Sequence, residues 1–140
     1  LHLMSRGRYT LHRAMSLVDG RRTGGLDLEV MDHWTGVARP VSTLSGGEGF
    51  LAALALALGL ADVIQAYSGG IRLDAVFVDE GFGSLGESDL DAVIHALQDL
   101  QGGGRLVGII SHVQELKARI QTRLEVTKGR DGSHARFVLR

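Results

Sequence analysis

Apolar residues recur along the chain in three patterns, and each pattern predicts a different element. Leu26, Leu28 and Val30 alternate with polar residues, which is typical of a strand with one buried face. The run 50–64 is almost continuously apolar and rich in Ala and Leu, so it is too long for a strand and predicts a helix buried on most faces. The short β-favouring run 75–78 predicts a strand buried on both faces of a sheet.

Glycine-rich and polar turns separate these runs and define the remaining elements. The turn-rich segment 19–25 joins the two strands of a predicted hairpin, and Pro40 restricts the next strand to a sheet edge. Strands that alternate with helices indicate an α/β fold, with antiparallel strands added at both ends of the chain. The predicted strands are 9–18, 26–31, 37–41, 73–78, 106–110, 123–128 and 134–139, and the predicted helices are 45–67, 87–100 and 114–120.

The segment Leu44-Ser45-Gly46-Gly47-Glu48 begins the longest predicted helix. Ser45 can cap this helix, and Glu48 three residues later completes the spacing of a capping box. Gly46 and Gly47 leave the first turn without side chains, so its unpaired N–H groups and the positive end of the helix dipole are open to an anion such as phosphate. A well-capped buried helix without a ligand explains the same residues equally well.

Polar groups end two of the predicted strands. Asp79 and Glu80 follow the first, and Ser111 and His112 follow the second. Ligands of open α/β sheets bind at the carboxyl ends of strands. An aspartate followed by a glutamate suits nucleotide hydrolysis, in which the first carboxylate holds Mg²⁺ through water and the second polarises the attacking water. The alternatives are a simple strand-end turn for the carboxylates and a histidine bound to a backbone carbonyl for His112.

The composition excludes several classes of protein. Hydrophobic residues make up 44% and charged residues 22%, which excludes a disordered chain, and the lack of cysteine excludes disulfides and thiolate metal sites. The run 50–64 is shorter than the ~20 residues of a membrane span and contains Asp62, so we predict no membrane segment. The other five histidines show no metal-ligand spacing, and we expect Trp34 to pack rather than to stack on bases.

Charge is distributed unevenly although the net charge is only −1. Residues 1–39 carry six basic and four acidic side chains, residues 40–104 one and nine, and residues 105–140 eight and three. These sections therefore have charges of +2, −8 and +5. Basic ends around an acidic middle indicate either a surface for a polyanion or simply solvated faces that fold against one another.

Together, three motifs in this order resemble those of an ABC-type ATPase. Leu44-Ser45-Gly46-Gly47-Glu48 resembles the signature motif, residues 76–85 resemble a Walker B motif with its D-loop, and Ile110-Ser111-His112-Val113 resembles the switch-histidine segment. The glutamate that ends the signature and the run Asp79-Glu80-Gly81-Phe82-Gly83 look most like the SbcC family. These are prokaryotic ATPases of DNA double-strand-break repair that work with the nuclease SbcD. The resemblance covers nearly the whole chain.

The resemblance implies that residues 1–140 are the C-terminal lobe of an ABC-type P-loop ATPase head. Such a lobe has a mostly parallel sheet with flanking helices and antiparallel hairpins at the ends. The N-terminal Walker A lobe would lie far away in sequence, across a coiled coil, and we expect a chain that begins at Leu1 to be a piece of a longer protein. Neither lysine, Lys117 or Lys128, follows a glycine as a Walker A lysine does. We therefore expect no complete nucleotide site in this chain.

The same resemblance implies a role for each motif residue. Asp79 would organise Mg²⁺ through water, Glu80 would be the general base for water attack, and His112 would sense the γ-phosphate of ATP. The residues that would face the ATP γ-phosphate of an opposing head are Ser45, Gly46, Gly47 and Glu48.

Ser84 would belong to the D-loop. The family usually has an aspartate after the D-loop leucine, but Gly86 stands there in this chain, with Glu87 one position later. This departure puts the D-loop role in doubt.

The partners that the resemblance implies are the chain's own N-terminal lobe, a second head in a homodimer, an SbcD-like nuclease and double-stranded DNA, in the cytoplasm at the nucleoid. ATP would hold two heads together and its hydrolysis would release them, which would control DNA end processing by the nuclease. Two alternatives remain open. One is a non-catalytic module that tethers DNA and docks a partner; the other is the nucleotide-binding subunit of an ABC transporter, although transporters usually end the signature in glutamine.

Overall fold

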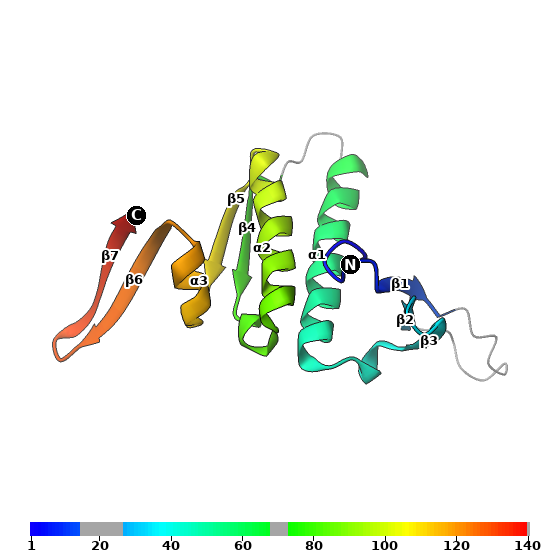
Figure 1. The fold of residues 1–140 in the computed structure, drawn as a ribbon. Coiled ribbons are helices and arrows are strands. Elements are labelled where there is room, and N and C mark those ends of the chain that lie inside the picture. The colour runs from blue at the N-terminus through cyan, green and yellow to red at the C-terminus, as the bar shows by residue number, and fades with distance from the viewer. Residues whose placement is uncertain (15–26, 68–72, 140) are drawn as a thin grey trace. The chain divides into compact units, whose positions relative to one another are not determined.

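The structure is a computed structural model that describes residues 1–14, 27–67 and 73–139 (Figure 1). The chain forms two compact units, Leu1–Ile110 and Ser111–Arg140. Within the described residues there are three small sheets, with three, two and two strands. The fold is therefore mixed α/β, as predicted.

The first unit begins with an antiparallel sheet in the order β1-β2-β3. Its strands are β1 (Tyr9–Arg13), β2 (Leu28–Asp32) and β3 (Val37–Pro40), and a short 3₁₀ helix, η1 (Val41–Thr43), follows. The central strand carries the fully buried Val30. Pro40 ends an edge strand, as predicted, because proline has no N–H to donate to a further strand. The predicted strand 9–18 ends earlier, at Arg13, and residues 15–18 lie outside the described part of the chain.

Helix α1 (Gly46–Tyr67) covers nearly the whole predicted range. The prediction that it is buried on most faces is wrong for this chain, because its buried residues, Gly47, Leu51, Ala52 and Leu54, all lie in the first half. An 18-residue window of the helix has a mean hydropathy of 1.9, and 17% of that window is buried.

The run 50–64 is itself shorter than a membrane span, but the helix that contains it extends beyond the run at both ends. By length and composition alone this helix could span a bilayer, as many core helices of soluble proteins could.

Two parallel strands follow, β4 (Ala75–Asp79) and β5 (Leu106–Ile110), paired from Ala75↔Leu106 to Asp79↔Ile110. Between them the chain forms the 3₁₀ helix η2 (Phe82–Ser84) and helix α2 (Glu87–Gly102). Helix α2 packs on β5 through a stripe of buried residues at helical spacing, as predicted, namely Leu90, Val93 and Leu97.

The prediction that β4 is buried on both faces is wrong. Phe77 is exposed, as are Leu106 and Ile110 on β5, while Val78 is buried. The aromatic ring of Phe77 lies across Gly108 of β5, where a Cβ atom would come within 2.4 Å of it. One face of this strand pair is therefore covered by α2, and nothing in the described residues covers Phe77 on the other.

The second unit contains helix α3 (Gln114–Arg119) and the predicted hairpin of β6 (Thr122–Gly129) and β7 (Gly132–Leu139). The turn is tighter than the predicted loop 129–133, because Gly129 pairs directly with Gly132. Gly132 has φ +122, a conformation that favours glycine.

The predicted mostly parallel sheet is not what the described residues form. Five of the seven strands pair antiparallel, and the parallel part consists of β4 and β5 alone. A parallel pair needs cover on both faces, and this pair has it on one. The parallel direction of β4 and β5 is confirmed.

Candidate functional site

The start of α1 forms the predicted capping box. The backbone N–H of Ser45 donates to Glu48 Oε2 at 2.9 Å, and the backbone N–H of Glu48 donates to Ser45 Oγ at 3.3 Å. Ser45 and Gly46 are both exposed, so the helix start is open to solvent. The geometry therefore combines a well-capped helix with an accessible N-terminus, which can receive an anion.

Glu48 is also bound from the N-terminal sheet, a contact that the sequence did not indicate. The Tyr9 hydroxyl donates to Glu48 Oε1 at 2.5 Å, and the guanidinium groups of Arg8 and Arg39 lie 3.7 and 3.6 Å from its carboxylate oxygens. Burial raises the pKa of Glu48, but the hydrogen bonds from Tyr9 and Ser45 and the charge of Arg39 outweigh burial, so this pKa lies below its ordinary value. Glu48 is thus held as a carboxylate that joins the sheet to the helix.

Arg8 is fixed on the other side by Asp32, a carboxylate that is only 2% exposed. Arg8 Nη2 donates to Asp32 Oδ2 at 2.9 Å, and the Trp34 N–H donates to Oδ1 at 3.0 Å. The hydrogen bond from Arg8 holds the pKa of Asp32 below its ordinary value despite burial. The guanidinium also lies over the rings of Tyr9 and Trp34, at 4.6 and 4.7 Å from their centroids.

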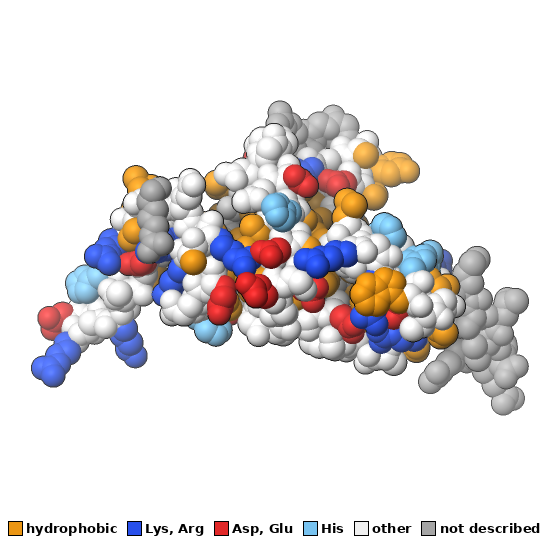
Figure 2. All heavy atoms as spheres, viewed as in Figure 1, with side chains coloured by type: hydrophobic (Ala, Val, Ile, Leu, Met, Phe, Trp, Pro, Cys, Tyr) orange, Lys and Arg blue, Asp and Glu red, His pale blue; other side chains and the backbone are white. Residues whose placement is uncertain are grey.

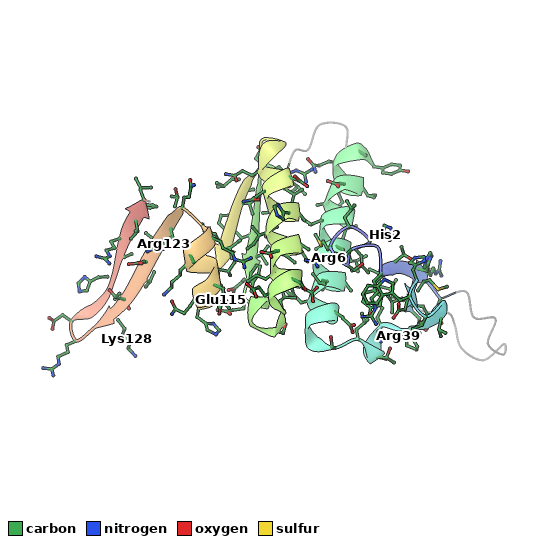
Figure 3. All side chains as sticks on the ribbon, in the orientation of Figure 1. His2, Arg6, Arg39, Glu115, Arg123 and Lys128 are labelled. Carbon is green, nitrogen blue, oxygen red and sulfur yellow. The ribbon has the colours of Figure 1, made fainter. Side chains whose placement is uncertain are left out.

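We predicted that Trp34 packs, and its ring contacts the Arg8 guanidinium. The side chain of Trp34 is exposed. Figure 3 shows Arg39 within the group of side chains between strands β1–β3 and the start of α1. We call Arg8, Tyr9, Asp32, Arg39 and Glu48 the sheet–helix network.

At the end of β4, the chain turns sharply at the predicted pair of carboxylates. Asp79 is the last residue of the strand, and both Asp79 and Glu80 are exposed. Glu80 has φ +59, and its N–H donates to the carbonyl of Ile110 on β5 at 2.9 Å. A left-handed conformation is uncommon for a residue other than glycine, and such residues cluster at functional sites.

The turn after Glu80 packs against the start of α1. The Ser84 hydroxyl donates to the carbonyl of Gly81 at 2.9 Å and closes the turn. A Cβ atom on Gly47 would lie 2.7 Å from the carbonyl oxygen of Ser84, so only glycine allows this close approach. The structure therefore brings together three of the predicted sites: Ser45–Gly47, the Glu80 turn and Ser84.

His112 belongs to the second unit, two residues after β5 ends, and its side chain is exposed. Ser111 beside it accepts a hydrogen bond from the Val113 N–H at 3.2 Å. The structure thus places His112 just beyond the strand end, as the sequence indicated, and its role stays a prediction.

The donors available for a metal are few. Among the described residues, no group of three or more His, Cys, Asp or Glu side chains could hold an ion. Mg²⁺ commonly keeps several waters and takes one or two carboxylates together with the phosphates of a substrate. The exposed Asp79 fits such a partial site and does not fit a closed protein cage.

Charged side chains of both signs lie close together on the face of the first unit seen in Figure 2, where blue and red groups are interspersed. The contacts of the first unit include the ion pairs Arg8–Asp32 at 2.9 Å and Arg105–Asp62 at 2.8 Å. Of the basic side chains in residues 1–39, Arg8 and Arg39 lie beside carboxylates, those of Asp32 and Glu48.

Comparison with known proteins gives consistent matches. Residues 15–99 match the family model described as SbcC/RAD50-like, Walker B motif. The chain is 59% identical over 135 residues to the SbcC subunit of the SbcCD nuclease of Vibrio cholerae serotype O1, and 54% identical over 134 residues to the protein of the same name in Treponema pallidum. Each alignment covers 96% of the chain and 13% of the relative. The chain thus spans about an eighth of the length of these relatives.

Solved structures show the same fold at low identity. One, from work on ATP-driven dimerization and DNA-stimulated activation of SMC ATPases, matches with a TM-score of 0.71 and 16% identity over 98% of this chain and 77% of that chain. Another is the Smc head domain with an extended coiled coil from Pyrococcus furiosus, bound to the C-terminal domain of ScpA. It matches with a TM-score of 0.68 and 17% identity over 99% of this chain and 32% of that one.

Proposed function

Because this chain belongs to the SbcC/RAD50-like family, we propose that it is the C-terminal lobe of an ATPase head that closes on ATP and controls DNA end processing by a partner nuclease. The observation that carries the proposal is the contact between the open start of α1 and the turn that holds Glu80. The open helix start and the candidate base thus lie in contacting segments of the first unit. Two such heads would form composite ATP sites.

Glu80 is the general base in this proposal. Its carboxylate is exposed at the end of β4, and the left-handed backbone at Glu80 sets the direction in which the side chain leaves the strand. Asp79, one residue earlier, is placed to bind a hydrated cation, and Mg²⁺ when bound would neutralise charge on the ATP phosphates. His112 would hold the attacking water or the γ-phosphate by a hydrogen bond.

Ser45, Gly46, Gly47 and Glu48 serve the opposing head. The exposed Ser45 hydroxyl and the N–H groups at the helix start are suited to bind the terminal phosphate of ATP held by the other head. Glu48 carries a negative charge and is engaged by Tyr9, Arg8 and Arg39, so it supports the helix start and does not itself bind the phosphate. This refines the role that the resemblance implied for Glu48. Ser84 lies against Gly47 and belongs to the same surface.

A second lobe with the Walker A motif would complete each site. The exposed apolar residues on α1 and on the β4–β5 pair support this part of the proposal, because such surfaces are normally covered. The segment would work in the cytoplasm at the nucleoid, with an SbcD-like nuclease and double-stranded DNA as partners. A transporter subunit is not supported, because the matched family is SbcC/RAD50-like.

Substitution of Glu80 in the complete protein tests the proposal. We expect Glu80→Gln to lower ATP turnover by roughly 10²–10⁴-fold, as for loss of a general base, and to trap an ATP-dependent dimer. Glu115→Gln changes an exposed glutamate on α3; it is the matched control and should leave turnover unchanged. Full turnover in the Glu80→Gln protein would show that Glu80 is not the base.

The role of the helix start is tested separately. Ser45→Arg should leave ATP binding intact and abolish ATP-dependent dimerisation, since the added side chain blocks approach of a phosphate. Ser42→Arg, three residues earlier and also exposed, should dimerise normally. If the Ser45→Arg protein still dimerises, the start of α1 is a capped helix start without a role in dimerisation.

A second candidate function, DNA tethering, rests on Lys128 and Arg130, which are exposed at the tip of the β6–β7 hairpin. DNA affinity of the complete protein should then fall steeply with salt. The double substitution Lys128→Glu and Arg130→Glu should reduce the slope of log K against log salt by roughly 0.9 for each DNA phosphate that is no longer neutralised. An unchanged slope would remove the hairpin from the DNA interface.

A further inference from the structure

We propose that Phe50 is a positioning residue that couples the start of α1 to Glu80 within the same chain. Through Phe50, engagement of Ser45–Gly47 by a phosphate would set the orientation of Glu80. This inference rests on the proposed function, because it assumes that Glu80 is the base.

Glu80 needs support to keep its backbone conformation. At φ +59 a residue with a Cβ atom is less stable than in the common backbone regions, so the surrounding structure must maintain this conformation. On one side the Glu80 N–H is bound to the Ile110 carbonyl at 2.9 Å. This hydrogen bond fixes the amide before Glu80 and leaves the following peptide to be held by other contacts.

Phe50 supplies the contact on the following side. Its ring lies against Gly81, so that a Cβ atom there would come within 2.3 Å of ring atoms Cδ2 and Cε2. Gly81 also has φ +95, so it must be glycine for both its conformation and its contact. The ring therefore fills the space beside the residue that immediately follows Glu80.

The same ring is anchored to the core of the turn. Phe50 and Phe82 meet edge to face, with centroids 5.1 Å apart and planes at 62°, and Phe82 is only 1% exposed. Phe82 is close-packed in the core, so the Phe50 ring cannot move further toward the turn without displacing Phe82 or Gly81. Phe50 is thus wedged between the helix and the Glu80 turn.

Phe50 would move together with the start of α1, the end of the helix that would face the phosphate. Phe50 lies in the first turns of the helix, two residues after Glu48, and Gly47 in the same segment contacts the Ser84 carbonyl. A displacement of Ser45 and the helix start would therefore be passed to the turn at two places, Gly47–Ser84 and Phe50–Gly81. The expected consequence is that dimer formation orients the base in the head that provides the signature.

The test is Phe50→Leu in the complete protein. We expect kcat for ATP to fall by roughly tenfold or more, since small displacements of a catalytic group have effects of up to about 10²-fold. KM for ATP and ATP-dependent dimerisation should stay within about twofold of wild type. Phe50→Tyr, which keeps the ring, should retain near wild-type kcat. If Phe50→Leu does not fold, Phe50→Met tests the same contact with a smaller change in volume.

Leu97→Val is the matched control. Leu97 is buried on α2, so its variant also removes packing from the first unit. Equal losses of kcat in the Phe50 and Leu97 variants would overturn the inference, because the effect would then be general loss of packing. Loss of dimerisation in Phe50→Leu as severe as in Ser45→Arg would also overturn it.

Glu80→Gln separates this inference from the proposed function. If Glu80→Gln abolishes turnover and Phe50→Leu leaves kcat unchanged, only the coupling through Phe50 fails. If Glu80→Gln itself leaves turnover unchanged, the proposed function fails first.

Discussion

The two halves of α1 are alike in composition and differ in what surrounds them. Residues 50–56 and 57–64 are both largely apolar. In the first half, Leu51 is 2% exposed and the helix start is bound by the sheet–helix network and the Glu80 turn. In the second half, Leu60 is 57% exposed, and the ion pair of Asp62 with Arg105 is one of the few defined contacts. Apolar composition alone therefore does not decide which part of a helix its own chain buries.

The difference also separates two roles along one helix. The first half has its partners within this chain and forms the candidate site. The second half presents an apolar face formed by Leu60, Val63, Ile64 and Tyr67. A face of this kind is usually covered by another part of the protein. We interpret it as the surface for the proposed N-terminal lobe.

The largest expected effect concerns the exposed half. The chain expressed alone should self-associate, because its uncovered apolar residues favour burial between molecules. The double substitution Leu60→Glu and Val63→Lys should reduce this association, and Ala66→Glu on the same helix should do so less. Light scattering of purified samples measures the effect. A monodisperse, sharply melting wild-type chain would contradict the comparison.

Truncation of one leucine in each half gives the next effect. In the complete head, Leu51→Ala should lower the free energy of unfolding by about 2–5 kcal/mol, the range for a buried leucine. Leu60→Ala should lower it by about 1 kcal/mol or more if a second lobe covers this half. Urea denaturation measures both. A Leu60→Ala effect near zero would mean that the second half stays exposed in the complete protein.

Removal of one hydroxyl tests the sheet–helix network. Tyr9→Phe deletes the donor to the Glu48 carboxylate, which should cost toward the lower end of about 1.5–3 kcal/mol, because Ser45, Arg8 and Arg39 still bind Glu48. ATP-dependent dimerisation should weaken while ATP binding persists. Tyr67→Phe, at the exposed end of the same helix, should change stability by less than about 0.5 kcal/mol. Equal effects in the two variants would contradict a role for the network.

The smallest expected effect is a pH dependence. The pKa of Asp32 is lowered in the folded state, chiefly by the hydrogen bond from Arg8. Its stabilising contribution is therefore fully present above the ordinary aspartate value of 3.8 and is lost as the pH falls through the lower folded value. In Asp32→Asn, the free energy of unfolding should therefore fall less steeply than in wild type between pH 5 and about pH 2. If wild type and Asp32→Asn lose the same amount of stability at low pH, other carboxylates cause that loss.

Features set by neighbours in sequence could be predicted well. The capping box needs only Ser45 and Glu48 three residues apart, and the structure contains both of its hydrogen bonds. The α2 stripe and the β6–β7 hairpin followed from local periodicity and glycine positions, and both were found. The two strands were predicted to end at Val78 and Ile110; they end at Asp79 and Ile110, which are aligned in one parallel pair.

Features set by distant residues could not be predicted. Tyr9 and Glu48 are 39 residues apart, and no local pattern signals that the hydroxyl reaches the carboxylate. The contact of Phe50 with Gly81 could not be predicted either, because in the sequence Phe50 is one of many apolar residues in an apolar run. The predicted burial of α1 and β4 was wrong for the same reason, since it depends on which surfaces are present to cover them.

The sequence by itself determined the elements, the capped helix start, the two carboxylates at a strand end and the family resemblance. All of these depend on residue types at short, regular spacings. Only the tertiary structure decided that Glu48 is held by Tyr9, that Gly47 lies on Ser84, and that Phe50 supports the turn after Glu80. Such contacts arise from close packing between segments far apart in the chain, where shape and hydrogen-bond direction matter more than composition.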